Sequence, residues 1–189
     1  MNVLNKDEFL NKGLVMPRRL REQVFIYPTD TIYGIGCDAT NDLMVDKVRD
    51  IKDRFDMPFS VIAPSLKWIK DNCEVNDKAK EWMEKLPGPY TLIMKLKNKS
   101  AVSESVTLGK ETIGVRMPDN WFMDVVKQMK IPIVTTSANV TGEDFMTCVD
   151  DMSKEIGNKV DIIIHDGVLQ GRPSTLVFLH KDNIELKTR

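Results

Sequence analysis

Residues 131–142 read IPIVTTSANVTG, an apolar run that passes directly into a cluster of hydroxyl and amide side chains. The first part, Ile131–Thr135, is short and rich in β-branched residues, so it predicts a strand. The cluster Thr135–Gly142 follows at the end of that strand. Open α/β sheets bind their ligands at the carboxyl ends of strands. The stretch therefore predicts a polar site beside a strand, although a plain loop with helix caps has the same composition.

Further strands and helices alternate on both sides of this stretch. Six more short apolar runs, bounded by Pro, Gly, Asp or Asn, predict strands: Val24–Tyr27, Phe59–Ala63, Thr91–Leu96, Ile113–Met117, Asp161–Ile164 and Thr175–Leu179. Apolar residues at helical spacing predict helices over Met44–Phe55, Ala79–Leu86 and Phe122–Met129, the last opened by Pro118-Asp119, and a shorter helix from about Val149 to Ile156 that ends at Gly157. With no clear linker or repeat, the pattern predicts an α/β fold: a single domain over residues 1–189, with a twisted mixed β-sheet and flanking helices.

Composition excludes several classes of protein. The chain has 189 residues, 42% of them hydrophobic and 29% charged, which is typical of one soluble globular domain. Its net charge of −1 and its lack of a long apolar run predict neither bulk nucleic-acid binding nor a membrane span. Its three cysteines form no CxxC pair, which argues against a Cys-rich zinc site and is consistent with a reducing cytoplasm. The sequence also lacks HExxH, GxSxG and Walker A motifs.

A second polar segment, YPTDTIYGIG, follows the strand predicted at Val24–Tyr27. Proline blocks continuation of the strand, and exposed hydroxyls with close-approach glycines suit a polar ligand. Residues 34–39 also satisfy the GxGxxG/A pattern. We reject the dinucleotide-binding interpretation because the first glycine lies several residues beyond the strand instead of in a tight turn.

Three cations lie at positions where they can bind an anion. Lys52 and Arg54 lie together where a predicted helix stops, and such a pair can hold a phosphate or a carboxylate, although a solvated helix end has the same pattern. Arg116 lies inside an apolar strand, where a cation usually needs an anionic partner. Together with the hydroxyl-rich segments, which include residues 171–175, these cations indicate a polar small molecule that carries phosphate.

Six segments, in this order, resemble the YrdC-type family of threonylcarbamoyl-AMP synthases. They are YPTDTIYGIGCDA (27–39), KDR (52–54) ahead of a Pro-led strand, PGPYT (87–91), TIGVRMPD (112–119), TTSANVTG (135–142) and PSTLVFL (173–179). The resemblance implies a concave, positively charged cavity. It also implies a reaction in which L-threonine, bicarbonate and ATP give threonylcarbamoyl-adenylate and pyrophosphate, with no prosthetic group. A separate threonylcarbamoyl-transferase complex then modifies tRNA beside the anticodon.

The resemblance also assigns roles to individual residues. It implies contact with threonine for Thr31, Arg116, Ser137 and Ser174, Arg116 pairing the carboxylate, and contact with ATP for Lys52, Arg54, Thr112, Asn139, Thr147 and Lys187. Lys52, Arg54 and Arg116 are the expected catalytic residues. Mg²⁺ is expected to travel on the triphosphate with no assigned protein ligand, Asp30 being the one carboxylate near enough in sequence to consider.

The chain departs from the family pattern in three places. Phe55 follows Arg54 where a proline is usual, and the loop that ends at Met57-Pro58 is one residue short. Residues 145–147 keep only the threonine of a Ser-Pro-Thr run. At the C-terminus, Lys187 or Arg189 replaces an expected Arg-Gly segment.

Other interpretations remain open at the level of sequence. A paralogue with the same fold can bind nucleotide or double-stranded RNA without synthase activity, and weak RNA binding finds local support in Arg18, Arg19 and Arg21. A carbamoyl-adenylate-forming module, as in larger hydrogenase-maturation proteins, is a further alternative, which we expect less because a single-domain chain is predicted here.

Overall fold

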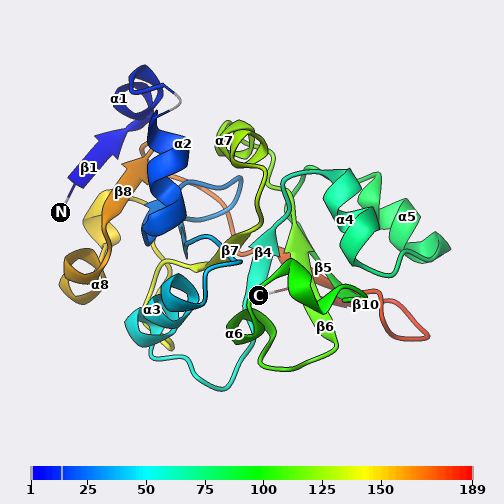
Figure 1. Cartoon of the computed structure of the whole chain (residues 1–189). Helices are drawn as coiled ribbons and strands as arrows, with labels where there is room; N and C mark the ends of the chain where they lie inside the picture. Colours follow the sequence, from blue (N-terminus) through cyan, green and yellow to red (C-terminus); the bar gives the residue numbers. More distant parts are fainter. Residues whose placement is uncertain (1, 14, 189) are drawn as a thin grey trace.

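A computed structural model describes residues 2–13 and 15–188 and arranges ten strands in one mixed sheet (Figure 1). The order across the sheet is β1-β8-β2-β3-β7-β4-β6-β5-β9-β10. The strands are β1 (Asn2–Asn5), β2 (Phe25–Tyr27), β3 (Gly34–Gly36), β4 (Ser60–Ile62), β5 (Tyr90–Lys95), β6 (Thr112–Arg116), β7 (Ile133–Ser137), β8 (Ile162–His165), β9 (Thr175–Phe178) and β10 (Glu185–Lys187). Parallel and antiparallel pairs are both present, which confirms the mixed α/β sheet predicted from the sequence.

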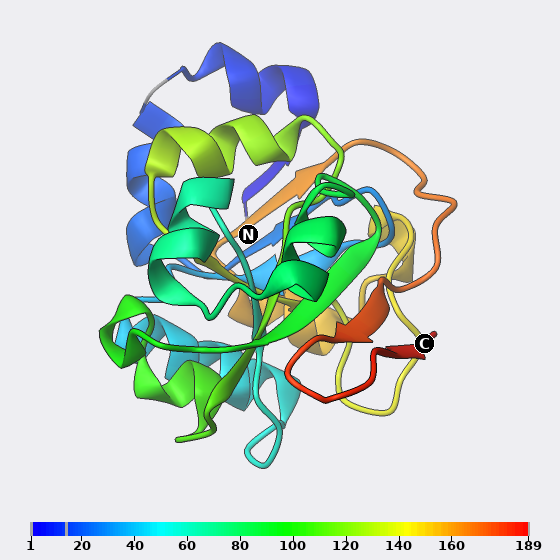
Figure 2. The same cartoon turned by 90° about the vertical axis from the view of Figure 1, so that its right-hand side faces the viewer.

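Helices flank the sheet on both sides. They are α1 (Lys6–Asn11), α2 (Val15–Arg19), α3 (Asp42–Lys52), α4 (Leu66–Asn72), α5 (Asp77–Met83), α6 (Glu104–Thr107), α7 (Phe122–Met129) and α8 (Lys154–Lys159), with 3₁₀ turns at Leu20–Glu22, Lys99–Ala101 and Val149–Asp151. In Figures 1 and 2, α7 and α4 lie above the strands, and α3 and α6 lie below them.

The central strand β7 joins the two halves of the sheet. Its first three residues, Ile133–Thr135, pair with β4, whereas Thr136 and Ser137 pair with β3 on the other side. The strand that the sequence predicts at residues 131–135 is therefore the place where one half of the sheet passes into the other. Its carboxyl end, with the hydroxyl side chains, lies at that junction.

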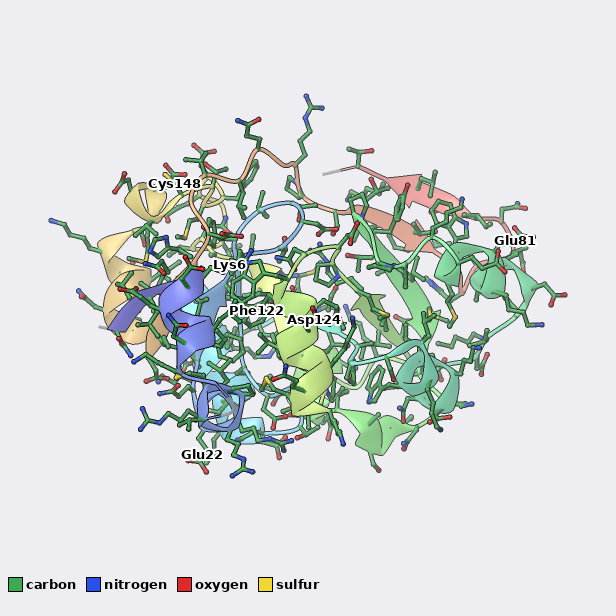
Figure 3. All side chains as sticks on the ribbon, turned by 90° about the horizontal axis from the view of Figure 1, so that it is seen from above. Lys6, Glu22, Glu81, Phe122, Asp124 and Cys148 are labelled. Carbon is green, nitrogen blue, oxygen red and sulfur yellow. The ribbon has the colours of Figure 1, made fainter. Side chains whose placement is uncertain are left out.

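Aromatic side chains pack α7 against the sheet. Phe122 is fully buried, and its ring stacks on that of Tyr27 with a centroid distance of 4.8 Å and an interplanar angle of 17°. The Phe25 ring lies 6.1 Å from the same phenylalanine ring. Figure 3 looks down on α7 and shows Phe122 and Asp124 on this helix, between the N-terminal helices and the α4–α5 pair. Truncating a buried phenylalanine typically costs about 3–5 kcal/mol of stability. Phe122 therefore contributes strongly to the packing of α7 on β2.

All seven predicted strands are present, and three further strands were missed. β1 and β10 are edge strands with largely exposed side chains, so they lack the apolar pattern of a buried strand. β3 is short and has two glycines in three residues, a composition that disfavours strands. Gly36 is required there because a Cβ at this position would lie 1.9 Å from the carbonyl oxygen of Val134. Since these glycines lie within a strand, the rejection of the dinucleotide-binding pattern is confirmed.

All four helix predictions need a correction at their ends. The helices predicted to reach Phe55 and Leu86 end earlier, at Lys52 and Met83. The helix predicted over about Val149 to Ile156 is instead a 3₁₀ turn followed by α8, because the Ser153 side chain accepts the Ile156 N–H and caps a new start. Gly157 lies inside α8 and does not end it. The α7 helix begins at Phe122 and not at Pro118-Asp119, and the Asp119 N–H binds the Asp30 carboxylate instead.

Candidate active site

A cavity of about 170 Å³ lies at the junction marked by β7. Its walls come from Thr29, Ile32, Tyr33, Gly34, Arg54, Pro58, Ser60, Thr91, Arg116, Thr135, Thr136, Ser137, Asn139, Phe145, Pro173 and Ser174. Most of the polar members carry hydroxyl or amide groups. Two arginines line the cavity, whereas no Asp or Glu among the described residues does. The walls therefore offer neutral hydrogen-bonding groups and two positive charges.

Arg116, at the end of β6, is held by a buried carboxylate. Its Nη2 donates to Asp30 Oδ1 at 2.6 Å and lies 3.4 Å from Thr31 Oγ1. Asp30 Oδ2 accepts the Asp119 N–H at 3.1 Å, so both carboxylate oxygens are occupied. The two charged side chains are 7% and 9% exposed. Arg116 Nε has no hydrogen-bond partner among the described residues. The guanidinium is thus fixed in direction while part of its donor capacity stays unused.

Arg54 reaches the cavity from the loop that follows α3. The helix ends at Lys52, and the next residue, Asp53, adopts the left-handed conformation with a φ of +48° and turns the chain. Arg54 Nη2 then donates to the Pro58 carbonyl at 3.1 Å, and Nη1 lies 3.4 Å from Thr136 Oγ1. Burial lowers the pKa of Arg54. Its hydrogen-bond acceptors are neutral oxygens, and although Asp56 is near enough to act on its charge, no carboxylate bonds to it directly among the described residues.

The floor of the cavity is made of small and hydroxyl-bearing residues. Thr91 Oγ1 and Ser174 Oγ share a hydrogen bond of 2.7 Å, which ties β5 to the start of β9. Gly114, in the middle of β6, leaves the floor open: a Cβ there would lie 2.3 Å from Ser60 Oγ and 3.1 Å from a Thr91 methyl carbon. Side chains two residues apart on a strand share a face. Thr112, Gly114 and Arg116 therefore form one line along this face, and Thr112 continues the floor beyond the cavity.

Lys52 lies behind the cavity wall instead of in it. The side chain is 1% exposed, and its ammonium donates to the carbonyls of Ser137 and Asn139 and to Asn139 Oδ1. Burial, together with the like charge of Arg54, lowers the pKa of Lys52 to about 7. The Thr141 N–H and hydroxyl both donate to the Lys52 carbonyl. Lys52 thus joins the end of α3 to the segment that follows β7.

The structure brings five of the predicted site residues to the cavity: Arg54, Arg116, Ser137, Asn139 and Ser174. Thr31 is buried directly behind Arg116, and Thr112 lies at the far end of the same strand. Thr147 is bound by its hydroxyl and N–H to Asp151 and does not line the cavity. Lys187 is an exposed residue of β10, also outside the lining, and Arg189 lies outside the described residues. Met57, in the loop that is one residue short, is 49% exposed and does not line the cavity.

Sequence reasoning missed several lining residues, among them Thr29, Ser60 and Thr91. Thr29 and Thr91 do fall inside the motifs quoted above, so their position beside a predicted strand end was the available signal. Ser60 had no such signal, because its place in the wall depends on the pairing of β4 with the distant strand β6.

The described residues of the cavity region do not present the ligands of a metal site. Among the residues that the structure describes, no group of three or more His, Cys, Asp and Glu side chains is arranged to hold one. The Asp30 carboxylate, considered above, is taken up by Arg116 and the Asp119 N–H and does not offer a free ligand. The residues present therefore do not fit a protein-held Mg²⁺, and Mg²⁺ on the triphosphate stays a prediction.

No helix in the described part of the chain is long and apolar enough to cross a bilayer.

Fold and site together define an α/β protein whose central strand carries a small polar, arginine-lined cavity at its carboxyl end. A family model named for Sua5, YciO and YrdC, with the description "Telomere recombination", matches residues 19–188. The chain belongs to this Sua5/YciO/YrdC family, which confirms the resemblance found in the sequence.

Individual relatives carry the name of one enzyme. A protein of Methanocaldococcus jannaschii, provisionally named threonylcarbamoyl-AMP synthase, is 38% identical over 181 residues, which are 94% of this chain and 82% of the relative. The threonylcarbamoyl-AMP synthase of Bacillus subtilis is 33% identical over 153 residues, 78% of this chain and 44% of that protein. This chain thus matches less than half of the Bacillus enzyme.

Solved structures show the same fold. P. abyssi Sua5 complexed with L-threonine superposes with a TM-score of 0.86 at 25% identity, over 98% of this chain and 56% of that one. E. coli YciO gives a TM-score of 0.82 at 23% identity, over 100% and 94% of the two chains. A full-length HypF in a phosphate- and nucleotide-bound form gives 0.80 at 17% identity, which shows the fold alone.

Proposed function

We propose that this chain is a threonylcarbamoyl-AMP synthase, which converts L-threonine, bicarbonate and ATP into threonylcarbamoyl-adenylate and pyrophosphate. One observation carries the proposal: Arg54 and Arg116 lie in the same small cavity with hydroxyl and amide groups and no carboxylate in its walls. Such a site suits a substrate set that carries several negative charges. The curated relatives named for this activity support the proposal.

Arg116 binds the carboxylate of threonine. Its direction is set by Asp30, and both of its hydrogen bonds among the described residues use Nη2, so Nη1 is left to donate to an incoming carboxylate. Ser137 and Ser174 line the cavity beside it and bind the polar groups of the amino acid. Thr31 helps to orient Arg116, because its hydroxyl accepts a hydrogen bond of 3.4 Å from Arg116 Nη2.

Arg54 binds the phosphates of ATP. Its guanidinium is held by neutral acceptors, so its charge is available to an anion. Asn139 lies in the same wall, and Thr112 extends the floor along β6 in the direction that a nucleotide longer than the cavity requires. Because Arg116 is paired with Asp30, the cationic character that we propose for this site comes mainly from Arg54.

The residues position reactants and need no covalent intermediate. Bicarbonate and the threonine amine first form a carbamate with loss of water. A carbamate oxygen then attacks the α-phosphorus of ATP, and the bond from that phosphorus to the bridging oxygen of pyrophosphate breaks. Arg54 stabilises the negative charge on the leaving group, and Arg116 holds the nucleophile by its carboxylate. Lys52 supports the reaction by keeping Ser137 and Asn139 in place.

The wider role follows from the product. A threonylcarbamoyl-transferase complex passes the group to adenosine beside the anticodon of tRNA, in the cytoplasm. Mg²⁺ arrives on ATP and not on a protein site. The alternative of a paralogue that binds nucleotide or double-stranded RNA gains no support: Arg18 and Arg19 end the short helix α2, and Arg21 donates to the carbonyl of Met129.

The test is to incubate the pure protein with ATP, Mg²⁺, bicarbonate and L-threonine. Pyrophosphate release that needs both threonine and bicarbonate, together with the mass of threonylcarbamoyl-adenylate, is the expected result. A parallel reaction with Arg116→Ala checks that the product comes from this cavity. ATP binding without any adenylate product would contradict the proposal and favour the nucleotide-binding paralogue.

A further inference from the structure

Arg49 is a buried cation that neither lines the cavity nor belongs to any motif discussed above. It lies in the last turn of α3 and is 4% exposed. Its Nε and Nη2 both donate to the carbonyl of Ser105 in α6, at 2.8 Å from Nε. Its Nη1 donates in the opposite direction, to the carbonyls of Arg54 at 2.8 Å and Met57 at 3.0 Å. One guanidinium thus connects a helix to both ends of the loop that carries Arg54.

The contacts of Arg49 explain how the loop over residues 53–58 keeps its shape. The side chains at its tip are exposed, Phe55 by 60% and Met57 by 49%, and so contribute little packing. The Arg54 N–H binds the Arg49 carbonyl at 3.1 Å, which fixes the start of the loop. The guanidinium of Arg49 then fixes the carbonyl of Arg54 and the carbonyl three residues later.

A shared aromatic ring couples the two arginines. The Arg49 guanidinium carbon lies 4.4 Å from the ring centroid of Phe59, and that of Arg54 lies 5.5 Å from the same centroid. Burial, and then the like charge of Arg54, lower the pKa of Arg49. Two cations this close repel each other, so the buried position of Arg49 must be stabilised by its hydrogen bonds. Its planar set of donors holds three carbonyls at once, which a lysine cannot do in the same geometry.

We propose that Arg49 is a positioning residue that fixes the loop over residues 53–58 and thereby directs Arg54 into the cavity. The inference rests on the proposed function for the role of Arg54 in ATP binding. It accounts for the ordered shape of the short Phe55–Pro58 loop in this chain. The loop packs little by itself, and the guanidinium of Arg49 holds it by hydrogen bonds from α3. None of the hydrogen bonds that Arg49 makes among the described residues goes to Arg116 or Asp30, so we expect the threonine end to be independent of it.

The first experiment does not depend on enzyme activity. Trypsin cleaves after arginine only where the chain can open locally, and the Arg54–Phe55 bond lies in this loop. Wild type, Arg49→Met, Arg49→Lys and the control Arg18→Met, an exposed arginine of α2, are digested without substrates, and the cut site is identified by mass. We expect faster cleavage after Arg54 in Arg49→Met, less in Arg49→Lys, and wild-type behaviour in the control. Equal cleavage in all four proteins overturns the proposal.

The second experiment separates positioning from a general loss of stability. The dissociation constants of ATP and of L-threonine are measured for the same proteins, with melting temperatures beside them. We expect Arg49→Met to raise the dissociation constant of ATP by about 10- to 100-fold, which is the scale of a misplaced binding group. The dissociation constant of threonine should stay unchanged. For ATP, Arg49→Lys should lie between wild type and Arg49→Met. If the affinities for ATP and for threonine fall equally, and both fall together with the melting temperature, the proposal is overturned. If Arg49→Met does not fold, Arg49→Lys is used in its place, and a selective loss of ATP affinity is again the expected result. If wild type makes no adenylate, the proposed function fails, and the trypsin result still decides the role of Arg49.

Discussion

The two arginines of the cavity are held by different chemistry. Arg116 extends from a β-strand and is paired with the buried carboxylate of Asp30, so its charge is largely compensated. Arg54 extends from a loop and contacts carbonyl and hydroxyl oxygens, so its charge is not. A compensated cation on a rigid strand orients a ligand of fixed shape, whereas an uncompensated cation attracts a highly charged one. In the proposed function, this contrast is the reason for assigning the amino acid to Arg116 and the triphosphate to Arg54.

The largest expected effect comes from removing the uncompensated charge. Arg54→Met should lower kcat/KM for ATP by about 10²- to 10³-fold, as for other lost charge-stabilising donors in active sites. The fold should persist, because the arginine stem is replaced by an apolar side chain of similar length. Steady-state pyrophosphate release against ATP concentration measures the effect. Unchanged kinetics would show that the triphosphate binds elsewhere.

The next effect comes from removing the compensating carboxylate. Asp30→Asn leaves Arg116 buried without its partner, and breaking one side of such a pair typically costs about 3–5 kcal/mol of stability. The freed guanidinium also loses its direction, so the affinity for threonine should fall while that for ATP is little changed. Thermal unfolding and threonine titration measure the two effects, and Asp30→Glu should restore part of both. A threonine affinity that is higher in Asp30→Asn would contradict the positioning role of Asp30.

These two arginines also show what the sequence could and could not predict. Arg116 stood out because a cation inside the apolar run Ile113–Met117 requires an anionic partner, and the motif pointed to threonine. The sequence did not identify Asp30 as that partner, because the contact spans 86 positions and depends on the order of strands in the sheet. The presence of β7 was predictable from β-branched content, but its bounds were shifted: the strand predicted over 131–135 runs over Ile133–Ser137. The glycine strand β3, which pairs with the last two residues of β7, was not predicted.

A smaller effect concerns the third cation, Lys52. Its pKa of about 7 in the folded chain lies below its ordinary 10.5, so between these values the unfolded chain keeps a proton that the folded chain has released. Wild-type stability should therefore rise with pH across this window, by at most about 1.4 kcal/mol per pH unit from this group, and the contribution should stop changing below pH 7. Urea unfolding of wild type and Lys52→Met across the window measures it. Parallel curves for the two proteins would show that Lys52 keeps its ordinary pKa.

The smallest effect is expected at Lys187. The sequence placed this lysine in contact with ATP, whereas the structure places it exposed on the edge strand β10. Lys187→Met should change kcat/KM for ATP by no more than about two-fold, as expected for a solvated surface charge. The same assay as for Arg54 measures it. A much larger loss would show that the C-terminal strand moves to the cavity when ATP binds.

The assignment of the two arginines to different substrates is tested most directly by a crystal structure with L-threonine and a non-hydrolysable ATP analogue bound together. The account predicts the threonine carboxylate on Arg116, beside Ser137 and Ser174, and the phosphates on Arg54, with Asp30 still paired to Arg116. A threonine carboxylate bound to Arg54, or a triphosphate bound outside the cavity, would contradict it.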